Sequence, residues 1–284
     1  AGYHLGTGKI PLVYMQNSGF GNAINPLLSL CDPDVCSIPI LLLIGWRGEP
    51  GVRDEPQHIK QGKIQLDILK VIDIPYRIIS KNDQEVQPAI DKGVVRAISE
   101  NRPFAIIVKK GTFDKYRSPS LPTDDTLMTR EESLGIILKQ LSGNSIIVST
   151  TGKTSREIFE IREKNGESHS KDFLSIGSMG HCSSIALGVA LSNPKKKVIC
   201  IDGDGSLIMH MGSLSTIGKI KPKNYYHILI NNFVHESVGG QATSAKFIQI
   251  PKLVKANGHK HVFSVEDSFQ LNSQIKNLLG NEGP

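Results

Sequence analysis

Two stretches of this sequence decide its fold: VICIDGDGS at residues 198–206 and YYHILINN at residues 225–232. Each has the pattern of a buried strand that runs into a polar turn. Residues 207–221, between them, have the pattern of one helix. A strand, a helix and a second strand form a βαβ unit. We therefore expect both polar turns at the same carboxyl edge of a parallel sheet, where open α/β sheets bind ligands.

The two turns carry the groups of a magnesium–diphosphate site. Asp204 and Asn232 offer oxygen ligands that could converge on one hard cation. Gly203 and Gly205 allow backbone and phosphate to approach closely, and Ser206 begins a helix whose N-terminus favours an anion. GDG alone also marks ordinary hairpin turns. The flanking apolar strands and the intervening helix favour one joint site over two unrelated turns.

The composition is typical of a soluble globular protein. The 284 residues are enough for two domains, and the net charge of +6 is dispersed. Residues 195–197 form the one tight basic run, which, with few aromatics near it, predicts a solvated turn rather than a nucleic-acid surface. The longest apolar run, residues 38–46, is too short to cross a membrane. We expect a cytoplasmic protein that binds small anionic substrates, and neither nucleic acid nor membrane.

The cysteines fit the same compartment. Cys31, Cys36, Cys182 and Cys200 show no CxxC spacing. Buried free thiols in a reducing environment are the expectation.

Strand and helix patterns alternate through both halves of the chain, which predicts the α/β class. In the first half the predicted strands are 10–15, 38–46, 76–80 and 104–109, and the predicted helices are 22–30 (after a turn at 17–21), 57–71 and 84–100. In the second half, residues 129–132 predict a capping box that begins a helix. The strands predicted there are 145–149, 173–176, 198–201, 226–230 and 261–265, and the later helices are 181–191, 207–221 and 268–279.

The fold expected is two tandem open, mostly parallel sheets flanked by helices. Residues 1–114 and 130–284 would form the two domains. The segment 115–129, rich in Pro, Ser and Asp, is predicted to be the linker between them.

The GDG and NN turns resemble the signature of the thiamine-diphosphate enzymes. This resemblance implies that residues 1–114 are a pyrimidine-binding domain and residues 130–284 a diphosphate domain, with thiamine diphosphate and Mg²⁺ as cofactors. It implies that the metal ligands are the Asp204 carboxylate, the Asn232 side chain and the Val234 backbone carbonyl. The implied cofactor contacts in the two turns are Gly203, Asp204, Gly205, Ser206 and Asn232.

A second loop, residues 177–180 with sequence GSMG, resembles the pyrimidine-binding loop of that family. There Gly177, Ser178 and Met179 would contact the cofactor, and the large apolar side chain of Met179 would hold it in a bent shape. Taken on its residues alone, the segment also has a less favoured interpretation as a glycine-rich loop before a core methionine.

Two more segments resemble cofactor loops. Thr151 and Gly152 resemble the loop on the diphosphate side. An ATP-binding P-loop is excluded there, because Ile147 stands where that motif needs glycine. The SGFGN turn at residues 18–22 resembles one in the pyrimidine domain, which assigns Gly21 and Asn22 to the cofactor.

Three motifs narrow the resemblance to one group. GWRGEPG at residues 45–51, DEPQH at 54–58 and HESVGGQ at 235–241 resemble the phosphonopyruvate decarboxylases, with the sulfopyruvate decarboxylases as the neighbouring group. The resemblance covers essentially the whole chain. It implies a carboxy-lyase that converts 3-phosphonopyruvate to phosphonoacetaldehyde and CO₂ in phosphonate biosynthesis, with sulfopyruvate decarboxylation as the alternative.

Polar residues of these motifs are candidates for the substrate chemistry. A guanidinium fork matches a tetrahedral oxyanion, so Arg47 and Arg53 are the candidates for binding the phosphonate. The candidates for catalytic proton transfer are His58, His235, Glu236 and Glu49. Each also has a structural interpretation: residues 53–55 could be only a solvated charged loop. His210 is expected to be structural, and His181 receives no role.

The ends of the chain raise a further alternative. In the group of decarboxylases that the chain resembles, a glutamate that activates the cofactor precedes a helix. The sequence of that helix continues as AGYHL, which is residues 1–5 here. We expect that glutamate just upstream of Ala1, and a chain incomplete at both ends, because a final strand is also expected. The alternative is a non-catalytic thiamine-diphosphate-binding subunit that needs a partner's glutamate.

The same resemblance implies an assembly. Its members place the cofactor between the pyrimidine domain of one subunit and the diphosphate domain of another. A homodimer or higher homo-oligomer, with the active site at the subunit interface, is therefore expected.

Overall fold

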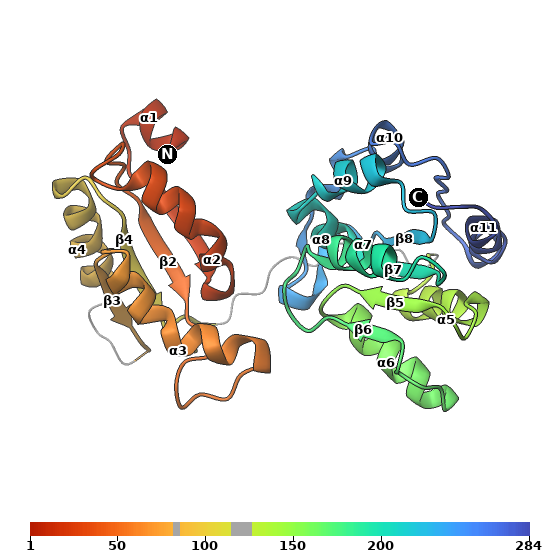
Figure 1. Ribbon diagram of the computed structural model, residues 1–284. Helices are drawn as coiled ribbons and strands as arrows, with labels where there is room; N and C mark the ends of the chain where they lie inside the picture. The colour runs from red at the N-terminus through yellow and green to blue at the C-terminus, as the bar shows by residue number, and fades with distance from the viewer. Residues whose placement is uncertain (82–85, 115–126) are drawn as a thin grey trace. The chain divides into compact units, whose positions relative to one another are not determined.

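The computed structural model describes residues 1–81, 86–114 and 127–284. The chain divides into two compact units, residues 1–118 and 119–284, and each contains its own parallel sheet (Figure 1). Most of the predicted linker, 115–126, lies outside the described residues, so its nature stays a prediction. Every helix within the described ranges is too short or too polar to cross a membrane.

The first unit is a four-stranded parallel sheet with strand order β1-β2-β4-β3. The strands are β1 (Leu12–Gln16), β2 (Leu41–Gly45), β3 (Tyr76–Ile79) and β4 (Phe104–Val108). The helices are α1 (Gly2–Thr7), α2 (Asn17–Pro26), α3 (Pro56–Val71) and α4 (Val86–Ser99), and α2 continues into the π-helical turn η1 (Leu27–Cys31).

The core of this unit lies on both faces of β4, all five residues of which are buried. Ala105 and Ile107 pack in a cluster with residues of α2 and α3. Phe104 and Ile106 pack on the opposite face, with residues of α4. A strand covered on both faces reads as a continuous apolar run, which is why 104–108 shows no alternation.

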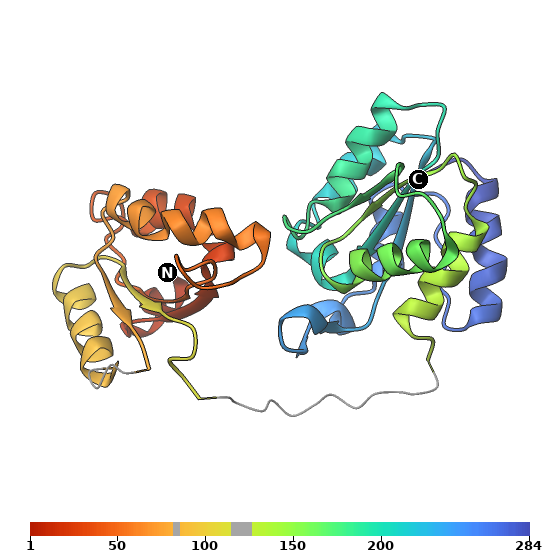
Figure 2. The same cartoon turned by 90° about the horizontal axis from the view of Figure 1, so that it is seen from below.

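The second unit is also a four-stranded parallel sheet, with order β6-β5-β7-β8 (Figures 1 and 2). Its strands are β5 (Ile146–Ser149), β6 (Asp172–Leu174), β7 (Val198–Gly203) and β8 (Tyr225–Ile230). The helices that alternate with them are α5 (Arg130–Gln140), α6 (Lys153–Asn165), α7 (Cys182–Ser192), α8 (Asp204–Met209) and α9 (Ser213–Ile220). After β8 come β9 (Val234–His235), the 3-10 turn η2 (Glu236–Val238), β10 (Gln241–Ala242), a second 3-10 turn η3 (Ser244–Phe247), α10 (Ile250–Ala256) and α11 (Ser268–Gly280).

Helices cover both faces of this sheet as well. Ile199 and Ile201 of β7 pack in one cluster with α5, α6 and α11. Val198 and Cys200 face the other cluster, with α7 and α9. The predicted capping box is confirmed: the Thr129 hydroxyl accepts from the Glu132 amide, and the Glu132 carboxylate accepts from the Thr129 amide.

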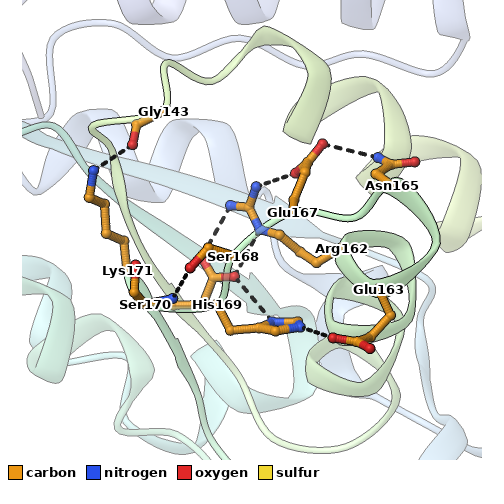
Figure 3. A network of polar contacts seen from close by, with 10 residues as sticks. Gly143, Arg162, Glu163, Asn165, Glu167, Ser168, His169, Ser170 and Lys171 are labelled. Atoms are coloured by element: carbon orange, nitrogen blue, oxygen red, sulfur yellow. Dashed lines mark hydrogen bonds and ion pairs between the residues drawn. The ribbon is translucent and has the colours of Figure 1, made fainter.

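A polar network fastens α6 to the short strand β6 (Figure 3). Arg162 donates to both carboxylate oxygens of Asp172, at 2.8 and 3.1 Å, and also to Glu167. Asp172 is fully buried as a side chain, so the pairing offsets the cost of its buried charge. Lys171 donates to the Gly143 carbonyl. These contacts fix β6, and with it the loop that follows, residues 175–181.

The prediction of one helix at 207–221 was wrong. The structure has two helices, α8 from Asp204 and α9 to Ile220, separated at residues 210–212. His210 leaves the helical conformation, with φ −134° and ψ 47°, and its ring packs 4.3 Å from that of His181. This contact supports the structural role expected of His210.

Two other elements also differ from expectation. Residues 17–21 are the first turns of α2 rather than a turn before it. Residues 261–265 form no strand: the end of the chain lies beside the start of β8, where the Gly283 amide donates to the Lys223 carbonyl. One cysteine, Cys36, is exposed, whereas the other three are buried, and all four are free thiols.

Candidate active site

The predicted cofactor residues of the second unit all lie at the carboxyl edge of its sheet. Thr151 and Gly152 follow β5, residues 177–180 follow β6, and Asp204 follows β7. In the β7–β8 pair, Gly203 is opposite Ile230, so the GDG and NN turns leave neighbouring strands at the same level. These motifs are about 25 to 80 residues apart along the chain. The crossover connections between the parallel strands bring them to the same edge of the sheet.

Asp204 is a buried acid at this edge. Only 2% of the residue is exposed, and the hydroxyl of Thr243 donates to its Oδ2. The same hydroxyl accepts from the Ala245 amide, and the Thr243 amide donates to the Phe233 carbonyl. Thr243 thus ties the Asp204 carboxylate to the loop that carries the second predicted metal ligand.

Asn232 and Val234 stand at the start of that loop. The Asn232 Oδ1 accepts from the Val234 amide at 3.2 Å, which closes a tight turn directly after β8. Phe233 between them has φ 60°, in the left-handed region. A carboxylate, a side-chain amide oxygen and a backbone carbonyl are oxygen donors of the kind that Mg²⁺ takes, so the residues present fit the predicted ion.

Glycine makes space at the GDG turn. A Cβ at Gly205 would lie 2.6 Å from the His235 ring and 3.4 Å from Met179 Cε, so these two side chains lie directly over the turn. The Gly180 amide donates to the Ser206 hydroxyl at 3.1 Å, which joins the loop after β6 to the start of α8. Ser206 therefore contributes a cross-link between loops, in addition to its expected place at a helix start.

The loop after β5 meets the loop after β8. Gly152 has φ 92°, and a Cβ there would lie 2.6 Å from the Ser237 hydroxyl oxygen. Ser178, in the loop after β6, has φ 54°, a conformation uncommon for a residue with a side chain. Strained backbone of this kind is typical of ligand-binding loops when the surrounding structure enforces it.

Glu236 is held in place by two cations. Its carboxylate accepts from Lys153 and from Arg130, the latter at 2.6 Å. Arg130 also makes two hydrogen bonds to Glu157, at 2.6 and 2.7 Å, and its side chain is 14% exposed. The hydrogen bond from Lys153, followed by that from Arg130, lowers the pKa of the Glu236 carboxyl. Glu236 is therefore suited to anchoring the loop as a carboxylate, and it has no proton to donate near neutral pH.

In the first unit, Arg47 belongs to a rigid loop. Its guanidinium donates to both oxygens of Asp54, at 2.5 to 3.2 Å, and its backbone is bonded in both directions to the Asn17 side chain. Asp54 also accepts from the Gly48 amide at 2.7 Å. The Arg47 hydrogen bond is the main cause that holds the pKa of Asp54 well below its usual range. Arg47 thus shapes the loop, and the Nε and Nη2 edge of its guanidinium is already bonded to a carboxylate.

The other predicted catalytic and substrate-binding residues of the first unit lie on the loop after β2 and at the start of α3. Glu49 lies on the same loop and pairs with Lys109 at 2.8 Å, and Arg53 is exposed on the loop. Gly48, with φ 66°, would place a Cβ 2.0 Å from the His58 carbonyl, so the loop packs tightly on the start of α3. Burial, and then the positive charge of Arg47, lowers the pKa of His58.

Gly21 and Asn22 lie on exposed positions of α2, not in the expected turn. Their helical setting changes the predicted geometry of this contact. Their assignment to the cofactor stays a prediction.

Three residues of these sites were missed by sequence reasoning. Thr243 has no motif around it, and the local pattern predicts only a helix start at Arg130 and a turn at Asn17. Each acts through a partner that is 30 or more residues away along the chain. A local pattern carries no signal for such contacts.

Similarity to known proteins gives the family. The family described as thiamine pyrophosphate enzyme, C-terminal TPP binding domain, matches residues 150–284. A phosphonopyruvate decarboxylase of Streptomyces viridochromogenes is 32% identical over 299 residues, covering 100% of this chain and 73% of that protein. The chain belongs to the thiamine-diphosphate-dependent decarboxylases. The resemblance carried by the GDG and NN turns is thereby confirmed.

Two further relatives come from the neighbouring group of this family. A sulfopyruvate decarboxylase of Methanosarcina acetivorans is 30% identical, covering 93% of this chain and 71% of that protein. A sulfopyruvate decarboxylase subunit beta of Methanocaldococcus jannaschii is 38% identical over 147 residues, covering 51% of this chain and 74% of that protein. As a member of these decarboxylases, the chain is a carboxy-lyase that acts on an oxo acid with thiamine diphosphate as cofactor.

Proposed function

We propose that this decarboxylase converts 3-phosphonopyruvate to phosphonoacetaldehyde and CO₂, with thiamine diphosphate and Mg²⁺, as a step of phosphonate biosynthesis. The observation that supports the cofactor and metal assignment most is the adjacent exit of Asp204 and Asn232 from β7 and β8 at one sheet edge. The choice of substrate is supported by the identity to phosphonopyruvate decarboxylases along the whole chain.

The second unit would hold the cofactor's charged end. Asp204, Asn232 and the Val234 carbonyl are the proposed metal ligands. The residues proposed to surround the diphosphate and the pyrimidine are Thr151, Gly152, Gly177, Ser178, Met179, Gly203, Gly205 and Ser206, together with Gly21 and Asn22 of the first unit. Bound thiamine diphosphate supplies the nucleophilic carbon and the electron sink for loss of CO₂.

The chain's own residues would bind the substrate and move one proton. The reaction removes CO₂ and adds a proton to the carbon that carried the carboxylate. His235 is one proposed proton donor, and the position of its ring over the Gly205 turn supports a role beside the cofactor. His58 is mainly neutral at pH 7, because burial and then the charge of Arg47 lower its pKa. His58 would therefore first accept a proton and then donate it. It would not act as a general acid that is protonated before the reaction.

Sulfopyruvate decarboxylation is the second proposal. It is supported by the sulfopyruvate decarboxylase of Methanosarcina acetivorans, whose identity to this chain is almost the same as that of the phosphonopyruvate enzymes. A third alternative, a subunit that needs a partner's glutamate, is supported by the relative that is named as a subunit. The homodimer with a shared active site remains our proposal for the assembly.

Aldehyde release from phosphonopyruvate and from sulfopyruvate, measured side by side with thiamine diphosphate and Mg²⁺, tests these proposals. Formation of phosphonoacetaldehyde that needs both cofactors is the expected result. Turnover of sulfopyruvate alone would replace the substrate and keep the chemistry. Cofactor binding without turnover of either acid would favour the partner-dependent subunit.

A further inference from the structure

The first unit has a hollow of about 320 Å³ that contains the candidate catalytic residue Glu49 and three lysines that none of the predicted sites includes. Its lining residues are Glu49, Val52, Ser80, Lys81, Lys109 and Lys110. They follow the carboxyl ends of three strands, β2, β3 and β4, which are parallel and neighbouring in the sheet. The hollow is therefore at the edge where open α/β sheets bind ligands.

The backbone that carries these lysines is fixed. The Lys109 amide donates to the Ile79 carbonyl at 3.1 Å, and the Thr112 hydroxyl bonds both the Lys109 and the Ile79 carbonyls. On the other side, the Trp46 amide donates to the Val108 carbonyl at 2.9 Å. The ends of three strands are thus joined by hydrogen bonds, and the stems of the lysines start from set positions.

The charge of the hollow is unbalanced. Its three lysines and one glutamate give a net +2. Glu49 is only 12% exposed as a side chain and pairs with Lys109, whereas Lys81 and Lys110 make no ion pair within the part of the chain that the structure describes. Like charges held together repel, and an anion between them relieves that cost. The arginine expected to bind the substrate's anion, Arg47, is already bonded to Asp54.

We propose that Lys81, Lys109 and Lys110 form the subsite for the tetrahedral oxyanion on C3 of the oxo acid. This proposal rests on the proposed function and adds to it a basis for substrate choice. A phosphonate has two ionisable protons and can carry two negative charges, and neighbouring lysines favour loss of the second proton, whereas a sulfonate carries only one charge. The net +2 of the hollow matches the dianion, so the subsite favours phosphonopyruvate over sulfopyruvate.

The test is binding of two unreactive probes to the cofactor-loaded enzyme by calorimetry. Phosphonoacetate presents a phosphonate and sulfoacetate a sulfonate. The double variant Lys81→Gln/Lys110→Gln keeps the Lys109–Glu49 ion pair, so it is expected to fold as the parent does. The full variant Lys81→Gln/Lys109→Gln/Lys110→Gln removes all three lysines. The triple variant Lys9→Gln/Lys63→Gln/Lys92→Gln removes the same charge from exposed positions elsewhere in the first unit.

We expect phosphonoacetate to bind the parent more tightly than sulfoacetate. The double variant should weaken phosphonoacetate binding by about tenfold and the full variant by about a hundredfold, as expected for loss of charge-assisted hydrogen bonds. The KM for the substrate should rise more than kcat falls. The thiamine-diphosphate affinity should not change, and the control variant should match the parent.

Several results would overturn the subsite. They are phosphonoacetate affinity that is unchanged in the full variant, an equal loss in the control variant, or tighter binding of sulfoacetate by the parent. A different result would contradict the proposed function without contradicting the subsite. If phosphonopyruvate is not decarboxylated but phosphonoacetate still binds in a lysine-dependent way, the subsite stands and the reaction assignment falls.

Discussion

At the scale of single residues, one hydrogen-bonded carboxylate organises a loop in each unit. Asp204 is held by the hydroxyl of Thr243, and Asp54 by Arg47 and two backbone amides. In both cases the partner fixes which way the carboxylate points. The first acid is proposed to meet a metal, and the second shapes a loop without meeting a ligand. Both residues are aspartates, so the residue type does not distinguish the two roles. The side chain that bonds each carboxylate does.

Asp204→Ala should abolish Mg²⁺-dependent binding of thiamine diphosphate, because the cofactor's charge would lose its anionic metal ligand. Thr243→Val should weaken that binding by about 10- to 100-fold, as loss of an outer-shell partner does. Calorimetry with and without Mg²⁺ measures both. Unchanged affinity in Asp204→Ala would contradict the metal assignment. A Thr243→Val affinity equal to the parent's would show that the hydroxyl does not orient the acid.

Asp54→Asn should lower the free energy of unfolding at pH 7 by about 1–3 kcal/mol, because it removes an ionic partner of Arg47. The folded pKa of Asp54 is depressed, so its contribution is fully present above the unfolded value of about 3.9 and is lost as pH falls toward the depressed folded pKa. Denaturant titrations from pH 7 downward measure the difference. The gap between parent and variant should close at acid pH. A gap that widened on acidification would contradict the assignment.

At the scale of elements, the carboxyl edge of the second sheet depends on loops that hold one another. The loop after β6 is bonded to the start of α8 through Gly180 and Ser206. The loop after β8 is held by Arg130 and Lys153, from the starts of α5 and α6, through Glu236. These helices therefore do more than cover the sheet. They position the segment that carries the second proposed metal ligand.

Arg130→Met and Glu236→Gln should each weaken Mg²⁺-dependent cofactor binding by about tenfold, and the double variant should be little worse than either. Residues in one ion-pair network couple by about 0.5–3 kcal/mol, so the effects should not add. Arg130→Lys, which keeps the charge but loses the fork, should fall between the parent and Arg130→Met. Calorimetry on the four variants gives the coupling. Strictly additive losses would mean that the two residues act independently.

At the scale of the whole molecule, the proposed catalytic residues are divided between two units of one chain. The second unit carries the proposed metal ligands, and the first carries His58 and the lysine-lined hollow. The proposed homodimer would join a first unit of one subunit to a second unit of another. That arrangement has a consequence for mixtures of inactive variants.

Asp204→Ala and His58→Ala proteins, each inactive alone, should regain activity when they are mixed and allowed to exchange subunits. Random exchange makes half of the dimers mixed, and each mixed dimer has one intact site of two, so about a quarter of the parent activity is expected. Aldehyde release before and after exchange measures this, with two batches of Asp204→Ala mixed as the control. Exchange without recovery would place both residues in a site within one chain. Full activity of His58→Ala alone would remove its catalytic role.

Much of this protein was determined by its sequence alone. Continuous apolar runs predicted doubly covered parallel strands, and the residues on either side of a strand end predicted that the GDG and NN turns share one edge. These features can be predicted from neighbours along the chain, because the apolar pattern of a strand and the cap of a helix lie within a few residues. The predicted helix at 207–221 is broken at residues 210–212, where the His210 ring contacts His181, and the predicted strand at 261–265 does not form. Only the tertiary structure showed that Thr243 bonds Asp204, that Arg130 bonds Glu236 and that Arg47 is bonded to Asp54. Each of those partners is a choice among many compatible side chains, and packing makes that choice after the elements have formed.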